Sequence, residues 1–376
     1  MMSTAPRPPD LDTEHSAHAQ LLRQVADSLV ALDYEPWQFG DSIAFEGMLA
    51  ASQAMNEPRV LGFVHGFLRG WAATRTRAFV PLDCTAPGLA LVEAHRRTGD
   101  PVLLGAALDL GRYLISRPRL GDVFITFEHT PLRQPHGPGE LAAEELSLLK
   151  ERPAGVFIDC LHFDPPFFAA LGSITHNEDW IDESIRQAIG YISLLQVDSG
   201  LFDHFMLTKS SATYGPGWGR GQGWALLGLL DLLEELPPTT DRVAEIRTAT
   251  SRLASEMLRL QRPDGHWHAI VGDATSGDET STAAFMAAGL VRAVRLGLAG
   301  DDAMCAAERA LDAAVAASDS RGILSGASEA VGACTSSSHY AHLPRGVVSS
   351  WGQGPLALAL AEFTKNEGIE VAASQG

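Results

Sequence analysis

Hydrophobic residues recur every three or four positions along most of the chain, whereas alternating strand-like runs are scarce. In the first such segment Leu21, Leu22, Val25, Leu29 and Leu32 share one helical face. Further helices are predicted over 43–55, 85–97, 102–115, 160–171, 181–196, 224–235, 243–260, 280–296, 302–317 and 355–363. Amphipathic segments alternate with segments that are apolar all round, so the pattern predicts an all-α fold.

Two kinds of connection recur between the predicted helices. A polar turn containing glycine closes a helix at 196–204, at 261–268 and, in a weaker copy, at 318–324. A loop with a charged or aromatic residue opens each apolar helix. The six openings carry Asp41, Asp83, Asp159, the pair Trp218 and Arg220, Glu279 and Trp351. Their spacing of roughly forty to seventy-five residues is typical of repeat architectures.

Six helical hairpins in succession predict a closed toroid, with six apolar inner helices inside six amphipathic outer ones. The inner helices would run in one direction, so their N-termini would line one mouth that favours an anionic ligand. A superhelical solenoid is the alternative, with capping repeats and stricter periodicity. We expect one catalytic domain over 19–366, a disordered segment over 1–18 and a frayed tail over 367–376.

The formal net charge of −18 argues against nucleic acid as a partner. The four cysteines, at 84, 160, 305 and 334, lack metal-site spacing and are expected to be mostly buried thiols. The N-terminus has no apolar signal-peptide core, and no run is long enough to span a membrane. We therefore expect a cytoplasmic protein with no membrane partner; the sequence leaves its oligomeric state open.

The stretch from Tyr214 to Trp224 concentrates five glycines, two tryptophans and Arg220 just before an apolar helix. Trp218 and Trp224 offer flat faces that can stack on a sugar ring, and Arg220 offers a planar fork for a carboxylate. A structural turn anchored by buried tryptophans is the alternative interpretation.

Carboxylates at the openings are the candidate catalytic groups. Asp83 and Asp159 have matching settings, Leu-Asp-Cys-Thr and Ile-Asp-Cys-Leu, and could face each other across the mouth. Such a pair raises one pKa, as a general acid requires. Each could instead cap a helix. Glu279 is a further candidate, or a first-turn acid favoured by the helix dipole, and Asp41 stands at the first opening.

The histidines do not complete a metal motif, although His339 and His342 are three residues apart. We therefore expect neither a metal nor another cofactor. His204 follows one of the repeated turns and could hydrogen-bond a sugar. The chain contains no nucleophile elbow, phosphate-binding loop or dinucleotide fingerprint.

Four motifs together resemble glycoside hydrolase families 88 and 105, the unsaturated glucuronyl and rhamnogalacturonyl hydrolases. They are Trp-Gly-Arg-Gly-Gln-Gly-Trp at 218–224, the Asp159 opening, Asp-Glu-Thr-Ser at 278–281 and Trp-Gly-Gln-Gly-Pro at 351–355. The resemblance covers about 37–362, is closer to family 105, and implies an (α/α)6 barrel that works without metal or cofactor.

By this resemblance the substrate is a short acidic oligosaccharide with a 4,5-unsaturated uronic acid at its non-reducing end. Asp159 would protonate C4 of the enol ether and then activate the water that adds at C5, and the resulting hemiketal would open to release the neighbouring sugar. Asp83 would be the second carboxylate. Trp218 and Arg220 match substrate-binding positions, and His204 matches a site histidine. The carboxyl group must be neutral at the working pH to donate its proton to carbon, and it can act as a base once it has lost that proton. Both steps are consistent with this chemistry.

The chain departs from the family pattern in two places. Phe157 stands where family 105 often has tryptophan, and the segment containing His129 and His136 does not clearly match the family's histidine-bearing loop. Other functions fit the same toroid. They are inverting hydrolysis of a saturated uronic glycoside by Asp159 with Asp83 or Glu279, sugar epimerisation or isomerisation, and sugar binding without catalysis.

Overall fold

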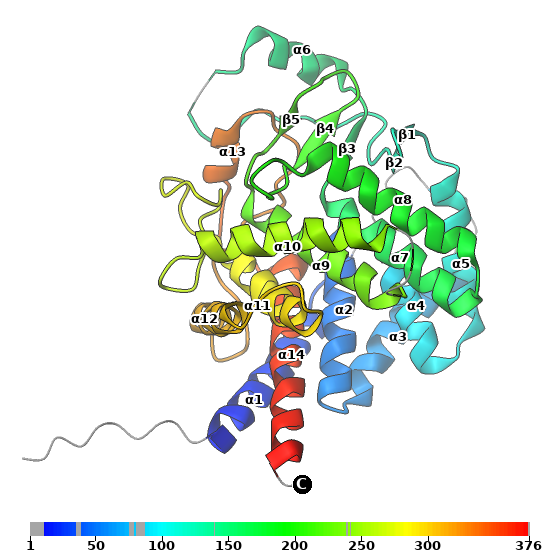
Figure 1. Cartoon of the computed structure of the whole chain (residues 1–376), viewed down its shortest axis with the longest axis vertical. Coiled ribbons are helices and arrows are strands. Elements are labelled where there is room, and N and C mark those ends of the chain that lie inside the picture. The colour runs from blue at the N-terminus through cyan, green and yellow to red at the C-terminus, as the bar shows by residue number, and fades with distance from the viewer. Residues whose placement is uncertain are drawn as a thin grey trace, which may run out of the picture.

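Six helices form a closed inner ring in the computed structural model (Figure 1). They are α2 (Phe39–Ala54), α4 (Gly88–Thr98), α7 (Asp159–Thr175), α9 (Gly219–Glu235), α11 (Thr280–Arg295) and α14 (Ser350–Ser374). Each packs against the next, and α14 packs against α2. The structure describes residues 11–34, 39–74, 79, 87–138, 140–237, 240 and 242–374, with side chains described only between 17 and 365.

Six further helices surround this ring: α1 (Leu11–Val30), α3 (Pro58–Thr74), α5 (Pro101–Ile115), α8 (Glu178–Leu195), α10 (Val243–Leu260) and α12 (Asp302–Ala316). Their burial follows the sequence pattern. The outer helix α10 buries one stripe that includes Ile246, Leu253 and Met257, whereas the inner helix α11 is buried on every side from Thr280 to Ala293. The predicted all-α toroid of six hairpins is therefore confirmed, and the ring closes as a barrel and not as a solenoid.

Three helices were not predicted from the sequence: α3, α6 and the five-residue α13 (Ser337–Ala341). Helix α3 buries only a narrow stripe, Val60, Val64 and Leu68, and its other faces are exposed or half-buried. Helix α6 (Ala143–Glu151) buries no residue. Helix α6 therefore gives no hydrophobic periodicity, whereas α3 carries Val60, Phe63, Val64, Phe67 and Leu68 at helical spacing, a pattern that the sequence analysis overlooked. Helix α1 begins at Leu11 and α14 continues to Ser374, so both helices extend past the limits expected for the domain.

Three cysteines lie in the described part of the chain, and all three are free thiols. Cys160 and Cys334 are buried free thiols, as expected, whereas Cys305 is exposed on α12. Within the described part of the chain, no helix combines the length and the apolar character needed to cross a membrane.

The three repeated turns dock on the outer helices in the same way. Their glycines, Gly200, Gly265 and Gly322, have φ angles of 98°, 83° and 76°, which favour glycine. A Cβ atom at these glycines would lie 2.8 Å from the Arg252 carbonyl of α10, 2.1 Å from the Arg309 carbonyl of α12 and 2.7 Å from the Val25 nitrogen of α1. The weaker third copy therefore contacts the first helix of the chain and helps to close the ring.

Glutamines near the start of two inner helices hold these turns. The amide of Gln222 on α9 accepts from the Phe202 nitrogen and donates to the Phe202 carbonyl, both at 2.8 Å. Gln353 on α14 accepts from the Leu324 nitrogen at 2.8 Å and donates to the Gly322 carbonyl at 2.7 Å. Both glutamines are buried, so these bonds satisfy turn backbone that water does not reach.

Short strands cover the end of the barrel where the inner helices begin (Figure 1). Strands β3 (Gly155–Phe157), β4 (Phe205–Leu207) and β5 (Thr213–Tyr214) form an antiparallel sheet in that order. Phe157 pairs with Phe205, which in turn pairs with Tyr214. A separate hairpin joins β1 (Arg119–Leu120) to β2 (Val123–Phe124). Strands of two or three residues are too short to show an alternating pattern in the sequence.

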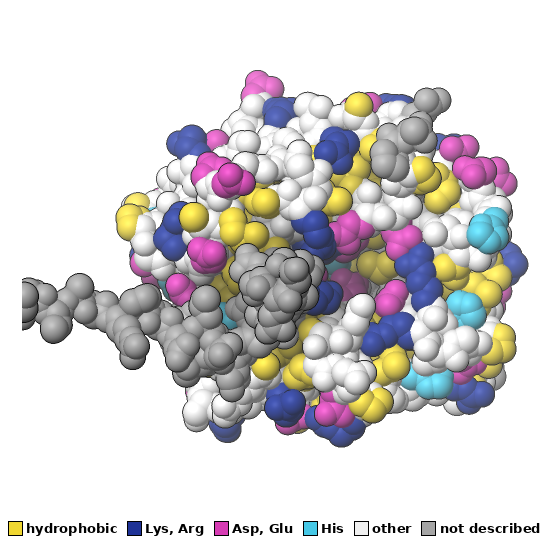
Figure 2. All heavy atoms as spheres, turned by 60° about the horizontal axis from the view of Figure 1, so that its bottom comes forward, with side chains coloured by type: hydrophobic (Ala, Val, Ile, Leu, Met, Phe, Trp, Pro, Cys, Tyr) yellow, Lys and Arg dark blue, Asp and Glu magenta, His cyan; other side chains and the backbone are white. Residues whose placement is uncertain are grey.

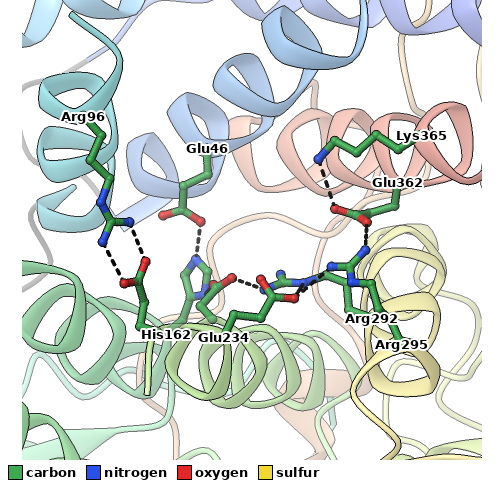
Figure 3. Close-up of polar contacts among 10 residues, drawn as sticks. Glu46, Arg96, His162, Glu234, Arg292, Arg295, Glu362 and Lys365 are labelled. Carbon is green, nitrogen blue, oxygen red and sulfur yellow. Dashed lines mark hydrogen bonds and ion pairs between the residues drawn. The ribbon is translucent and has the colours of Figure 1, made fainter. Parts of the chain in front are cut away.

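Charged side chains fill the opposite end of the barrel. Figure 2 shows acidic and basic side chains intermixed around a hollow on this face, and Figure 3 shows their contacts. The hollow has a volume of about 250 Å³. The network links α2, α4, α7, α9, α11 and α14 through Glu46, Arg96, His162, Asp231, Glu234, Glu235, Arg292, Arg295, Glu362 and Lys365.

His162 lies at the inner end of this network and is fully buried. Its Nε2 lies 2.9 Å from Oε2 of Glu46, and its Nδ1 lies 3.6 Å from Oδ2 of Asp231. Burial alone would lower the pKa of His162, but Glu46 and Asp231 outweigh burial and raise it. Oxygen and nitrogen atoms of these three residues lie within 4.8 Å of one another, close enough for a metal ion. However, the two ring nitrogens face different carboxylates, and Arg292 already pairs with Asp231, so the arrangement suits an imidazolium better.

We predict that His162 makes the free energy of unfolding pH-dependent. Because its folded-state pKa is raised, its stabilisation is present below the unfolded-state pKa of about 6.5 and is lost as the pH rises through the folded-state pKa. The stability difference between wild type and His162→Gln should therefore shrink with rising pH, by up to about 1.4 kcal/mol per pH unit in that window.

Urea denaturation from pH 6 to pH 9 measures this difference. The control is His342→Gln, at an exposed histidine, which should follow the wild-type pH dependence. A constant difference between wild type and His162→Gln would show that His162 carries no extra proton in the folded protein.

Candidate active site

A cavity of about 350 Å³ opens at the mouth of the barrel, among the N-termini of the inner helices. Its charged and polar lining includes Asp159, His204, Trp218 and Arg220, which the sequence analysis singled out. The other lining residues are Phe39, Thr126, Phe127, Pro131, Phe157, Cys160, Ala330, Val331, Gly332 and Ala333. The structure therefore brings four predicted site residues, from three different openings and turns, to one cavity.

Asp159 is the first residue of α7, and the capping position belongs to Ile158. The alternative interpretation of Asp159 as the helix cap is therefore wrong. Its side chain is 16% exposed, and its buried Oδ2 has no hydrogen-bond partner in the described part of the chain. Asp83 lies outside the described residues, so its pairing with Asp159 remains a prediction.

His204 reaches Asp159 because the β-sheet aligns the two segments. The His204 carbonyl accepts from the Ile158 nitrogen at 2.8 Å, and the His204 nitrogen donates to the Tyr214 carbonyl at 2.8 Å. The His204 backbone is thereby fixed next to the residue that precedes Asp159. As a result, Nε2 of His204 lies 3.4 Å from Oδ2 of Asp159. The imidazole is only 2% exposed.

Trp218 and Arg220 form the adjoining part of the cavity. The Trp218 ring lies 4.4 Å from the His204 ring, measured between centroids. The Arg220 guanidinium carbon lies 5.1 Å from the Trp218 ring centroid, close enough for a cation–π contact. Trp218 Nε1 and Arg220 Nε are both buried and have no hydrogen-bond partner among the described residues.

Arg220 forms a buried ion pair with Glu279, and each side chain is 1% exposed. The Arg220 guanidinium donates to Glu279 at 3.1 Å, to the Ser328 hydroxyl at 2.8 Å and to the Glu329 carbonyl at 2.9 Å. Glu279 also caps α11 by accepting from the Thr282 nitrogen at 3.0 Å, and it accepts from the Ser281 hydroxyl. The pair thus joins α9 and α11 to the segment that follows α12, at 328–329.

The surroundings of this ion pair keep both side chains ionised. Burial alone would raise the pKa of Glu279, but Arg220 and hydrogen bonds from Ser281, Ser328 and Thr282 outweigh burial and lower it. Burial lowers the pKa of Arg220, against the opposing charges of Glu279 and Asp159. Arginine nevertheless remains protonated in proteins, so both residues of the pair are charged.

Three candidates from the sequence lie apart from the cavity lining. Glu279 lies behind Arg220 and holds it in place. Trp224 is fully buried inside the barrel, where its ring contacts Phe163 and Phe285. Asp41 is buried in the first turn of α2 and is not among the residues that line the cavity. Direct substrate contact by these three residues remains a prediction.

The sequence analysis missed most of the apolar wall. Phe127 and Pro131 come from the segment before α6, and Ala330, Val331 and Ala333 from the segment before α13 (Ser337–Ala341). An antiparallel bridge between Phe127 and Gly155 and a parallel bridge between Leu132 and Ala333 bring these segments together. Neither segment is periodic, so hydrophobic spacing does not predict where these residues lie.

His339 supports this wall from behind. Its Nδ1 accepts from the His136 nitrogen at 3.2 Å, and its Nε2 lies 2.7 Å from the Val331 carbonyl. Burial lowers the pKa of His339, and it outweighs the hydrogen bond to the Val331 carbonyl, which acts in the opposite direction. A neutral ring with its proton on Nε2 satisfies both contacts. Nδ1 of His342 lies 2.8 Å from the Ser338 carbonyl. His342 and His339 therefore contact different backbone carbonyls.

A parallel ring of six inner helices inside six outer ones is an (α/α)6 barrel, and its mouth carries a carboxylate, a tryptophan and an arginine. The model of Glycosyl Hydrolase Family 88 matches residues 17–367. The chain belongs to this family and is a glycoside hydrolase.

Known proteins resemble the chain over almost its whole length. The unsaturated rhamnogalacturonyl hydrolase YesR of Bacillus subtilis (strain 168) is 25% identical over 337 residues, which are 88% of this chain and 90% of that protein. A possible GH105 member from Salmonella enterica serovar Paratyphi A has a TM-score of 0.80 at 19% identity over 97% of each chain. The unsaturated glucuronyl hydrolase of Bacillus sp. GL1 has a TM-score of 0.67 at 14% identity, over 93% of this chain and 95% of that one.

We predict that Glu279→Ala destabilises the protein strongly. The substitution leaves the buried guanidinium of Arg220 without its counter-charge, a change that typically costs about 3–5 kcal/mol. Urea denaturation followed by circular dichroism measures the loss. The control Glu245→Ala removes the partner of Arg242 in an exposed ion pair and should change stability little. Equal effects of the two substitutions would mean that the buried pair does not hold the mouth together.

Proposed function

We propose that this enzyme releases a 4,5-unsaturated uronic acid from the non-reducing end of short oligosaccharides produced by polysaccharide lyases. In this proposal Asp159 is the catalytic residue, and the cavity beside it holds the unsaturated ring. The family membership and the name of the relative YesR, an unsaturated rhamnogalacturonyl hydrolase, support the substrate class.

One observation carries the proposal most directly. Asp159, Trp218 and Arg220 line the same cavity, and two of their buried donors, Trp218 Nε1 and Arg220 Nε, lack hydrogen-bond partners among the described residues. A buried polar atom without a partner is costly unless a ligand supplies one. The Asp159 carboxyl group and the N–H donors of Trp218 and Arg220 match a sugar ring that carries hydroxyls and a carboxylate.

The geometry also suits an acid that becomes a base. Asp159 in its protonated form would donate its proton to C4 of the enol ether, and positive charge would develop at C5 and the ring oxygen. The resulting carboxylate of Asp159 stabilises this charge and takes a proton from the water that attacks C5. The hemiketal formed at C5 then opens and releases the neighbouring sugar, so one carboxylate completes the cycle and is regenerated as the acid.

The rest of the cavity wall would receive the remainder of the ring and the leaving group. Phe127, Phe157 and Val331 line it without charge. A water-poor wall strengthens the electrostatic interactions of Asp159 and Arg220 with the substrate. The inner-helix N-termini add partial positive charge at the mouth, which favours a uronate on a protein of net charge −18.

We predict that Asp159→Asn abolishes turnover and preserves the fold. An amide has nearly the same shape as the carboxyl group but cannot cycle a proton, so the rate should fall by at least about a hundredfold. The measurement is the loss of ultraviolet absorbance of the conjugated enol ether, on unsaturated products of pectin, ulvan, glycosaminoglycan and gellan lyases.

The matched control is Asp278→Asn. Asp278 lies near the mouth but is 57% exposed and does not line the cavity. This variant should keep wild-type turnover. Full activity in Asp159→Asn would contradict the assignment, and hydrolysis of saturated uronides with no loss of absorbance would point to ordinary glycoside hydrolysis.

A further inference from the structure

We propose that Tyr340 is a positioning residue that lets His204 act as either a hydrogen-bond donor or an acceptor toward Asp159. Through this pair, Asp159 would be supported both as a carboxylic acid and as a carboxylate. The inference rests on the proposed function, because it concerns the acid–base cycle of Asp159. Tyr340 was not identified as a site residue from the sequence.

The contact that carries this inference is short and buried. Tyr340 Oη lies 2.7 Å from His204 Nδ1, although the two residues are 136 positions apart. Tyr340 is 1% exposed and His204 is 2% exposed, so water does not compete for the contact. On its other side, Nε2 of His204 lies 3.4 Å from Oδ2 of Asp159. This distance is just beyond a good hydrogen bond and is common for catalytic contacts in enzymes without substrate.

The imidazole ring is held in this orientation by its neighbours. The Phe157, Phe205 and Tyr340 rings meet it edge-on, at centroid distances of 5.2, 5.3 and 5.7 Å, and Trp218 packs obliquely against it. Rotation of the ring would disturb all of these contacts. Nδ1 therefore stays directed at Tyr340, and Nε2 stays on the side of the ring that lies near Asp159.

The glycine-rich stretch makes room for the Tyr340 hydroxyl. Gly215 has a φ of 69°, and a Cβ atom there would lie 2.4 Å from Tyr340 Oη and 2.7 Å from the His204 Cβ. Any side chain at position 215 would thus push the two residues apart. The first glycine of this stretch therefore serves the contact between tyrosine and histidine.

A phenol can both donate and accept, and this property couples the two ends of the histidine. When Tyr340 donates to Nδ1, the neutral ring carries its proton on Nε2, which can donate to the Asp159 carboxylate. When Nδ1 carries the proton and donates to Tyr340, Nε2 can accept from protonated Asp159. Burial, together with Cys334, Asp159 and Asp203, raises the pKa of Tyr340 well above its usual value, so the phenol keeps its proton.

Other titratable or charged groups surround the pair and bear on any pH dependence. From the elements packed around it, they are Asp159 on α7, Asp203 in the same loop as His204, Arg220 on α9, and Cys334 and His339 in and before α13. None of them contacts Nδ1 among the hydrogen bonds of the described residues, so the Tyr340 hydroxyl is the group that sets the tautomer.

The test is Tyr340→Phe, which removes one oxygen and keeps the ring. Without the hydroxyl, Nδ1–H has no acceptor, so the tautomer that accepts from protonated Asp159 becomes unfavourable. We expect kcat to fall by about tenfold or more, KM to change little, and the alkaline limb of the pH–rate profile to move to lower pH. Melting temperatures should show that the variant is folded.

Tyr214→Phe is the matched control. Its hydroxyl contacts Ser210 at 3.0 Å, in the same sheet but away from Nδ1 of His204. The backbone bond from His204 to the Tyr214 carbonyl does not depend on that hydroxyl. Tyr214→Phe should therefore keep the wild-type pH–rate profile.

A second readout does not depend on turnover. Nitrogen-15 NMR of labelled histidine reports the tautomer of His204, assigned with His204→Gln. Over the pH titration, wild type should show both neutral tautomers of His204, with the proton on Nε2 and on Nδ1, whereas Tyr340→Phe should show only the Nε2 tautomer. An unchanged pH–rate profile and unchanged NMR titration in Tyr340→Phe would overturn the inference.

The two proposals fail separately. If wild type turns over no unsaturated uronide, the proposed function fails, and the NMR titration still decides the link between Tyr340 and His204. If wild type is active and Tyr340→Phe loses only thermal stability, with both titrations unchanged, Tyr340 has a structural role only and the inference alone fails.

Discussion

The buried pair between Arg220 and Glu279 is the interaction on which the architecture of the mouth depends. Taking two charges out of water costs free energy, and the cost is offset only when the remaining donors and acceptors are also satisfied. Here Ser281, Thr282 and the 328–329 segment satisfy Glu279 and the terminal nitrogens of Arg220, whereas Arg220 Nε has no partner among the described residues. The chain that follows Ser328, which Arg220 and Glu279 hold, forms the wall at 330–333 and then α13, so the position of Tyr340 depends on the same pair.

The two ends of the barrel carry opposite partial charges from the dipoles of the inner helices. At the mouth, helix N-termini and Arg220 offer positive potential to an acidic sugar. At the far end, the helices present partial negative charge, and basic residues of the last turns of α4 and α11, Arg96, Arg292 and Arg295, lie there. Their carboxylate partners keep the charges local (Figure 3). This compensation allows a charged barrel interior in a protein that is strongly acidic overall.

The sequence predicts the barrel well because the apolar pattern of each helix and the glycine of each repeated turn are both local features. Burial on all sides distinguishes α11 from α10, and the glycine of each repeated turn is required by its own backbone angle. Asp159 and Arg220 were found because each opens an apolar helix. Tyr340 was not found, because its five-residue helix has no periodicity and its partner His204 is 136 positions away. The second role of Glu279, as the counter-charge of Arg220, is likewise a property of contacts between helices and not of spacing.

Phe157 shows how a departure from the family pattern can be absorbed. Its ring stacks on Phe205 with centroids 4.9 Å apart and an interplanar angle of 10°, and it meets His204 edge-on. An aromatic ring therefore still lines the cavity and still holds the histidine. Unlike tryptophan, phenylalanine brings no N–H donor. The polar contacts available to a sugar thus come from other lining residues, among them Asp159, His204, Trp218 and Arg220, which surround the proposed catalytic carboxylate.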